Sequence, residues 1–61
     1  MRRLAKFEIY RDAGGDYRWR FRADNNQVVA SGEGYNSKDD CVHAVGLIKE
    51  QAPQAGVEDS T

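Results

Sequence analysis

The stretch that decides the fold is Tyr17-Arg18-Trp19-Arg20-Phe21-Arg22, in which aromatic side chains and arginines alternate strictly. Successive side chains of a β-strand point to opposite faces. This period of two therefore predicts a strand with rings on one face and guanidinium groups on the other. The segment supplies a core strand and a row of three arginines, and any account of function must explain what those arginines do.

Two further strands are expected around this one. Phe7-Glu8-Ile9-Tyr10 alternates in the same way, and Val28-Val29-Ala30-Ser31 begins a third strand that we expect to run to about Tyr35. The segments between them, residues 12–16 and 24–27, are rich in the Gly, Asp and Asn residues that favour tight turns. Three strands joined by short turns predict a three-stranded antiparallel meander.

The turns set the register of this sheet. A three-residue loop at residues 13–15 and a two-residue turn at Asn25-Asn26, which would pair Ala23 with Val28, bring the apolar side chains to one face. Gly32 then falls opposite Trp19 and leaves room for the indole. The expected core face consists of Phe7, Ile9, Tyr17, Trp19, Phe21, Val28 and Ala30.

The opposite face carries the arginines. The register places Arg20 beside Glu8 and Arg18 beside Glu33, and cross-strand pairs of opposite charge contribute about 0.2–1 kcal/mol each. Arg22 is expected to have the fewest partners. We therefore interpret this face first as a solvated surface whose arginine stems cover the sheet and whose heads pair with carboxylates.

The alternative interpretation is a binding surface. Arginines grip phosphate groups and an exposed aromatic ring stacks on bases, as in proteins that bind single-stranded nucleic acid. On that interpretation the candidate polyanion-binding residues are Tyr10, Arg18, Arg20 and Arg22.

A helix follows the third strand. Ser37 is a suitable N-cap, and the helix is expected to run to about Gln51 or Ala52, with Pro53 ending it. Its apolar side, which would cover one face of the sheet, consists of Cys41, Ala44, Val45, Ile48 and Ala52. The tail, residues 54–61, is polar and acidic and by itself is typical of a disordered end.

Composition limits the function classes. Nine basic and ten acidic side chains give a net charge of −1, so the chain lacks the basic footprint usual in nucleic-acid-binding proteins. One cysteine, Cys41, and one histidine, His43, leave no internal disulfide and no cysteine-based or multi-histidine metal site. We expect no catalytic, cofactor-binding or metal-binding residues, and we expect that the protein is not an enzyme.

Length and terminal sequence bear on assembly and location. A 61-residue chain buries little surface by itself, so oligomerisation is the expected source of added stability. The basic start, residues 1–6, is not followed by an apolar run of signal length, and no stretch approaches a membrane span. We therefore expect a soluble cytoplasmic protein with no membrane partner.

Four segments together resemble the YegP-like family of small domains of unknown function. They are residues 6–10, residues 17–21, residues 34–38 and the helix end at Ala52-Pro53. The most specific is the Tyr-Arg-Trp-Arg run followed about a dozen residues later by residues 33–38, Glu-Gly-Tyr-Asn-Ser-Lys.

The resemblance implies a β-β-β-α-β unit, two of which form one continuous sheet and exchange their C-terminal strands. This chain holds one unit, so the resemblance implies a homodimer in which residues 55–59, around Val57, form a short exchanged strand. The family carries no established activity, and no catalytic residue can be transferred from it.

These observations together predict one α+β domain over residues 1–61, with its core at about 6–58. The expected function is that of a dimeric, non-enzymatic protein-interaction module whose protein partner is unknown. The alternative is weak binding of nucleic acid or another polyanion through the arginines.

Overall fold

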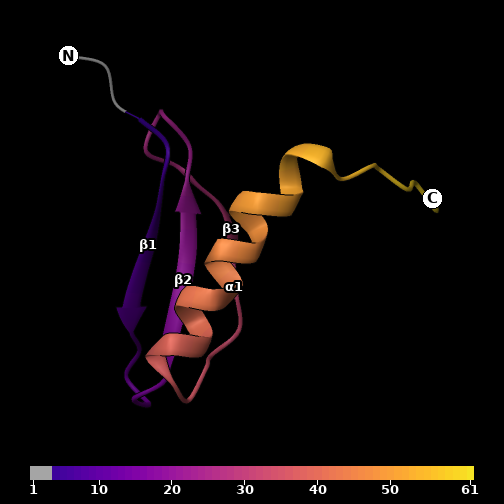
Figure 1. The fold of residues 1–61 in the computed structure, drawn as a ribbon. Helices are drawn as coiled ribbons and strands as arrows, with labels where there is room; N and C mark the ends of the chain where they lie inside the picture. Colours follow the sequence, from indigo (N-terminus) through magenta and orange to yellow (C-terminus); the bar gives the residue numbers. More distant parts are fainter. Residues whose placement is uncertain (1–3) are drawn as a thin grey trace.

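The structure is a computed structural model that describes residues 4–61, and the first residues of the basic start, 1–3, lie outside it. Three strands are followed by one helix, which confirms the α+β class (Figure 1). The sheet is antiparallel with the order β1-β2-β3. The elements are β1 Lys6–Arg11, β2 Tyr17–Arg22, β3 Val28–Ser31, α1 Lys38–Gln51 and the short 3-10 helix η1 Ala52–Gln54.

The first hairpin has the predicted register. Phe7 pairs with Phe21 and Ile9 pairs with Trp19. The Gly15 N–H donates to the Asp12 carbonyl at 3.0 Å, and Gly15 has a φ of +88°, so residues 13–15 form the predicted three-residue loop. Glycine is suited to this position because it adopts the left-handed region without steric cost.

The second hairpin differs from the prediction. The Asn26 N–H donates to the Ala23 carbonyl at 2.8 Å, and the Ala23 N–H donates to the Gln27 carbonyl at 2.8 Å. Asn26 has a φ of 70°, which asparagine tolerates better than most residues. The loop therefore has three residues, 24–26, instead of two, and the predicted pairing of Ala23 with Val28 is wrong.

The extra loop residue shifts the register of β3 locally. Arg22 pairs with Val28, whereas Phe21 pairs with Ala30 as predicted, so one additional residue of β3 is accommodated between these pairs. Such a bulge leaves one residue of the strand unpaired, while the pairs on either side of it still form.

A second irregularity follows β3, which ends at Ser31 and not at about Tyr35. The Gly32 N–H donates to the Trp19 carbonyl at 3.0 Å, which places Gly32 beside Trp19 as predicted. Tyr17 and Tyr35 then exchange two backbone hydrogen bonds of 2.8 and 2.7 Å. Uniform pairing from Gly32 would bring Gly34 opposite Tyr17, so this segment also contains one extra residue.

Ser37 caps α1 as predicted, because its Oγ accepts a hydrogen bond from the Asp40 N–H at 3.3 Å. The helix ends at Gln51, and η1, which contains Pro53, continues the chain for three residues. Residues 55–61 lie outside every helix and strand of the described chain and lead away from the sheet and α1 (Figure 1).

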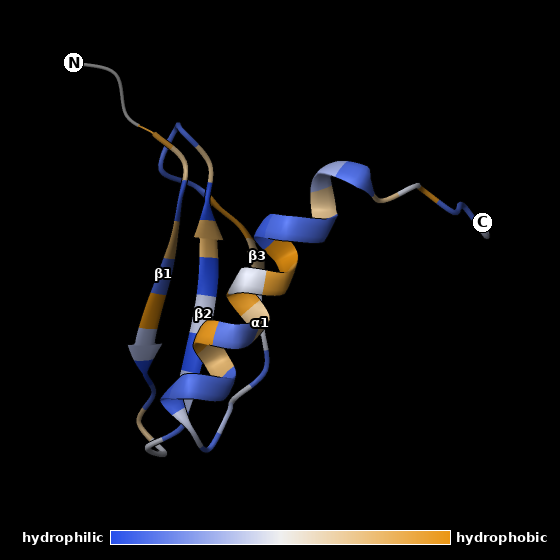
Figure 2. Ribbon diagram, in the orientation of Figure 1, coloured by the Kyte–Doolittle hydropathy of each residue, from blue (hydrophilic) through white to orange (hydrophobic). Residues whose placement is uncertain are grey.

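The core is small because α1 packs against β1 and β2 and does not reach β3. The buried residues are Trp19, Cys41 and Val45, and Phe7, Tyr17, Phe21, Tyr35 and Ile48 pack partly buried around them. Several residues predicted for the core remain exposed in the single chain, namely Ile9, Val28, Ala30 and Ala52. Figure 2 shows apolar residues along both α1 and β3, and Val29 of β3 and Leu47 of α1 are exposed.

Candidate functional site

The face of the sheet opposite α1, which we call the outer face, holds the candidate residues predicted from the sequence. Trp19 and Phe7 point toward the helix, so the alternating side chains of the same strands point away from it. The outer face consists of Lys6, Glu8 and Tyr10 from β1 and Arg18, Arg20 and Arg22 from β2.

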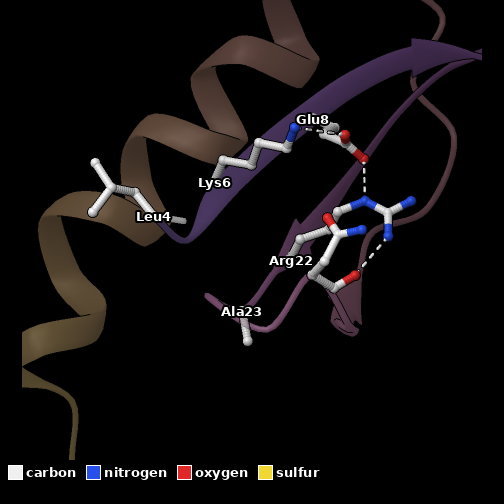
Figure 3. A pocket seen from close by; sticks show the side chains of 6 residues that line it. Leu4, Lys6, Glu8, Arg22 and Ala23 are labelled. Atoms are coloured by element: carbon white, nitrogen blue, oxygen red, sulfur yellow. Dashed lines mark hydrogen bonds and ion pairs between the residues drawn. The ribbon is translucent and has the colours of Figure 1, made fainter. Parts of the chain in front are cut away.

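Glu8 joins the strands on this face, and Figure 3 shows its carboxylate with Lys6 and Arg22. Its Oε1 accepts hydrogen bonds from Arg20 Nε at 2.6 Å and Arg22 Nε at 2.8 Å, and Lys6 Nζ lies 3.4 Å from its Oε2. The two guanidinium groups, with Lys6 in addition, lower the pKa of Glu8 from 4.5 to about 2. The carboxylate therefore stays ionised in all but strong acid, and it binds three cations.

Arg18 is held by Asp12 and not by Glu33 as predicted. The Arg18 Nε donates to Asp12 Oδ2 at 2.5 Å, and Asp12 Oδ1 accepts from the backbone N–H groups of Gly14 and Asp16. These bonds lower the pKa of Asp12, with the Arg18 bond the largest cause. The irregularity after Gly32 explains the error, because Glu33 no longer stands opposite Arg18.

Arg22, expected to have the fewest partners, has two. Its Nε binds Glu8, and its Nη1 donates to the Asn26 carbonyl at 2.8 Å. Glu8 pairs directly with Arg20 and is therefore the diagonal neighbour of Arg22. Long side chains reach diagonal neighbours in a sheet, so the predicted register of the first hairpin already allowed this ion pair.

Tyr10 lies with Arg20, whose guanidinium carbon is 4.5 Å from the centre of the ring. This cation–π contact partly covers the ring that the sequence offered as a stacking surface. The structure thus brings all four candidate residues, Tyr10, Arg18, Arg20 and Arg22, to one face of the sheet.

A cleft opens at the end of the outer face nearest the second loop. Its volume is about 560 Å³, and both Lys6 and Arg22 contribute to its wall (Figure 3). The lining residues are Leu4, Lys6, Glu8, Arg22, Ala23 and Asn26. This cleft is mostly polar and was not predicted, because the three-residue loop that brings Asn26 to Arg22 was not predicted.

On the other side of the sheet lies a groove, which we call the apolar groove. It has a volume of about 470 Å³ and lies between the sheet and the C-terminal end of α1, where the helix leads away from the strands (Figure 1). It is lined by Phe7, Trp19, Phe21, Ala30, Ile48, Lys49, Ala52 and Pro53. Sequence periodicity identified these apolar residues but predicted that sheet and helix would cover one another.

Cys41 is fully buried, and burial raises the pKa of its thiol, which keeps it protonated and unreactive. Within residues 4–61, no three His, Cys, Asp or Glu side chains are grouped to hold a metal ion. None of the helices in this part of the chain has the length and apolar character needed to cross a membrane.

Residues 12–59 match the family described as "Domain of unknown function (DUF1508)". The UPF0339 protein of Neisseria meningitidis serogroup B is 60% identical over 43 residues, which cover 70% of this chain and 77% of that protein.

Two structures solved by NMR in solution have the same fold. A protein from Haloferax volcanii is 39% identical, with a TM-score of 0.83 over 95% of this chain and 98% of the other. The protein ATU0232 from Agrobacterium tumefaciens is 43% identical, with a TM-score of 0.81 over 92% of this chain and 90% of the other.

Proposed function

Because this chain belongs to the DUF1508 family, also called UPF0339, whose descriptions name no activity, we propose its function from the two surfaces described above. It is a dimeric, non-enzymatic protein-interaction module in which each copy covers the apolar groove of the other. The observation that supports this most strongly is that the groove is open in a single chain while Val57, in the C-terminal segment 55–61, is 97% exposed.

The C-terminal segment of a second copy suits the apolar groove in its apolar character and its charge. Residues 55–61 lead away from their own body, so Val57 can reach a neighbouring copy (Figure 1). The groove is apolar except for Lys49 at its wall, and Val57 is followed by the acidic pair Glu58-Asp59. An apolar side chain flanked by carboxylates thus faces an apolar groove flanked by an ammonium group.

The sheet also offers a place for an exchanged strand. β1 and β3 are the two edges of the sheet, and an edge strand presents backbone groups that can pair with another chain. Residues 55–59 of the second copy would add a short strand there, with Val57 directed into the groove. Because only three side chains are buried within residues 4–61, such cover would add much to the stability of the protein.

The proposal predicts that the protein is a dimer and that Val57→Asp dissociates it. Burying a valine contributes about 1.5 kcal/mol or more, so losing both copies of Val57 raises the dissociation constant about a hundredfold. Sedimentation velocity over a range of concentrations measures this, with twice the 6.9 kDa chain mass expected for the unaltered protein.

The matched control is Ser60→Asp, which adds the same charge three residues further along the exposed tail. It is expected to leave the dimer intact. A monomer at micromolar concentration for the unaltered chain would refute the dimer. Equal masses for the two variants would refute the role of Val57.

The dimer leaves both outer faces directed away from the grooves, where a further protein can bind. The buried, protonated Cys41 supports a non-enzymatic role. Its free thiol suits a reducing compartment, and we propose the cytoplasm as the location.

A second candidate function is weak binding of nucleic acid or another polyanion through the outer face. One observation favours it: the ion pairs of this face join four cations, Lys6, Arg18, Arg20 and Arg22, to only two carboxylates. The face therefore carries an excess of positive charge on a chain whose net charge is −1. The experiment that closes the next subsection tests this candidate as well.

A further inference from the structure

The positive charge of the outer face is unevenly distributed. At one end Arg18 and Asp12 form an ion pair whose two charges cancel. At the other end the single carboxylate of Glu8 is shared by Lys6, Arg20 and Arg22. Three cations on one anion leave an excess of two positive charges among these paired side chains, and Asp24 in the adjacent second loop reduces the excess at that end to one.

The excess charge coincides with the cleft of about 560 Å³. Ligand sites in proteins are usually about 300–1,000 Å³, so the cleft has room for a phosphate group and the sugar attached to it. Figure 3 shows Lys6 and Arg22 on the two sides of the Glu8 carboxylate, and both belong to the wall of the cleft.

Arg22 is fixed in position before any ligand arrives. Its Nε binds Glu8 and its Nη1 binds the Asn26 carbonyl, both at 2.8 Å, and only 24% of its side chain is exposed. Of the five N–H donors of a guanidinium group, these bonds use two within the described chain. The remaining donors are held in the fork geometry that matches phosphate oxygens.

Lys6 is the mobile partner. Its Nζ lies 3.4 Å from Glu8, beyond the usual length of a charged hydrogen bond, and 58% of its side chain is exposed. Its ammonium group can therefore turn to a ligand at little cost, while Glu8 keeps its two arginine bonds.

We propose that the Lys6–Arg22 cleft binds the phosphate group of a phosphate ester, carried by a single nucleic-acid strand or by a free nucleotide. Arg22 supplies fixed donors and Lys6 supplies a movable charge. The inference rests on the second candidate function, and it assigns the ligand to one end of the outer face. The positive charge of this end favours an anion, and the forked donors of Arg22 suit the several oxygens of a phosphate group.

The test is an NMR titration of the isotopically labelled full chain. The probes are hexathymidylate, thymidine monophosphate and inorganic phosphate, each at about 50 mM and about 200 mM sodium chloride. The largest amide shifts are expected at Lys6, Arg22, Ala23 and Asn26. Shifts with hexathymidylate alone identify a strand as the source of the phosphate, and equal shifts with the monophosphate identify a nucleotide.

Two variants test the roles of the side chains. Lys6→Gln is expected to reduce the salt dependence for hexathymidylate by about 0.7 in the log–log slope, because one phosphate contact is lost. Lys38→Gln, which removes another exposed charge, from α1, is expected to leave binding unchanged. Arg22→Lys keeps the charge and is expected to weaken binding because the fork is lost.

Different results would contradict the cleft as the binding site and the binding of polyanions by the outer face. Shifts centred on Arg18 and Tyr10, or equal losses for Lys6→Gln and Lys38→Gln, would overturn the cleft but keep the second candidate function. No shift with any probe at the lower salt concentration would overturn both.

Discussion

At the scale of single residues, the closest fit is between Gly32 and Trp19. A Cβ at Gly32 would overlap the indole ring of Trp19, and the Gly32 N–H is bound to the Trp19 carbonyl at 3.0 Å. Trp19 is one of the three residues that are buried within residues 4–61, although part of it lines the apolar groove. The glycine is required for space and not for an unusual backbone conformation.

Gly32→Ala is therefore expected to destabilise the protein by about 1–3 kcal/mol, the usual cost of overpacking a filled core. Urea unfolding followed by circular dichroism at the helix band measures the change without relying on the fluorescence of Trp19.

Gly46→Ala is the matched control. Gly46 lies inside α1, and a Cβ there meets no atom within 4 Å. Because alanine favours the helix by about 1 kcal/mol over glycine, this variant is expected to be more stable than the unaltered protein. Equal effects of the two substitutions would show that the space beside Trp19 is not limiting.

At the scale of elements, the local sequence pattern predicts the strands and the helix. It does not predict the loop length and the bulges that connect them. Alternation of residues 17–22 with residues 7–10 established the first register, and Ser37 and Pro53 bounded the helix. The length of the second loop, and with it the bulge at the start of β3, depends on which asparagine adopts a positive φ, and Asn25 and Asn26 are equally suited to it by type.

The same limit applied to the candidate site. The arginines were correctly assigned to one face, because period-two alternation fixes the face of every residue in β2. The partners of the arginines were not correctly assigned. A shift of one residue moves Glu33 away from Arg18, and the three-residue loop brings Asn26 to Arg22. Register shifts in β3 therefore change which residues stand opposite the arginines, and they leave the face of the arginines in β2 unchanged.

Glu8 links β1 to β2, and its titration is expected to control their stability in acid. Its pKa is about 2 in the folded chain and 4.5 ordinarily, so the unfolded chain binds more protons between these values. Its contribution is fully present above about pH 4.5 and is lost as the pH falls through about 2. Urea unfolding over this range measures the loss.

Glu8→Gln is expected to be less stable than the unaltered chain at pH 7 and to have a flatter profile between about pH 4.5 and 2. Asp12, whose pKa is also lowered, leaves some slope. Glu50→Gln, on the exposed surface of α1, is the control and should follow the unaltered profile. An unchanged slope in Glu8→Gln would contradict the assignment of Glu8.

At the scale of the whole molecule, the sheet is wider than its helix. α1 covers β1 and β2, while Val28, Val29 and Ala30 of β3 stay exposed. The proposed dimer covers part of this surface, so folding and association are expected to be coupled.

Coupling of this kind predicts that the melting temperature rises with protein concentration. A tenfold increase adds about 1.4 kcal/mol to the stability of a dimer and nothing to that of a monomer. Calorimetry at several concentrations measures the rise, and Val57→Asp should reduce it. A melting temperature independent of concentration for the unaltered chain would contradict the coupling.

The three-residue loops have a kinetic consequence. Each hairpin brings together residues that are close along the chain, so little chain entropy is lost before the first contacts form. Hairpins of this kind form in about 1–10 μs. We expect the sheet to assemble long before two copies can meet by diffusion, which makes encounter between already structured chains the slow step in reaching the final state.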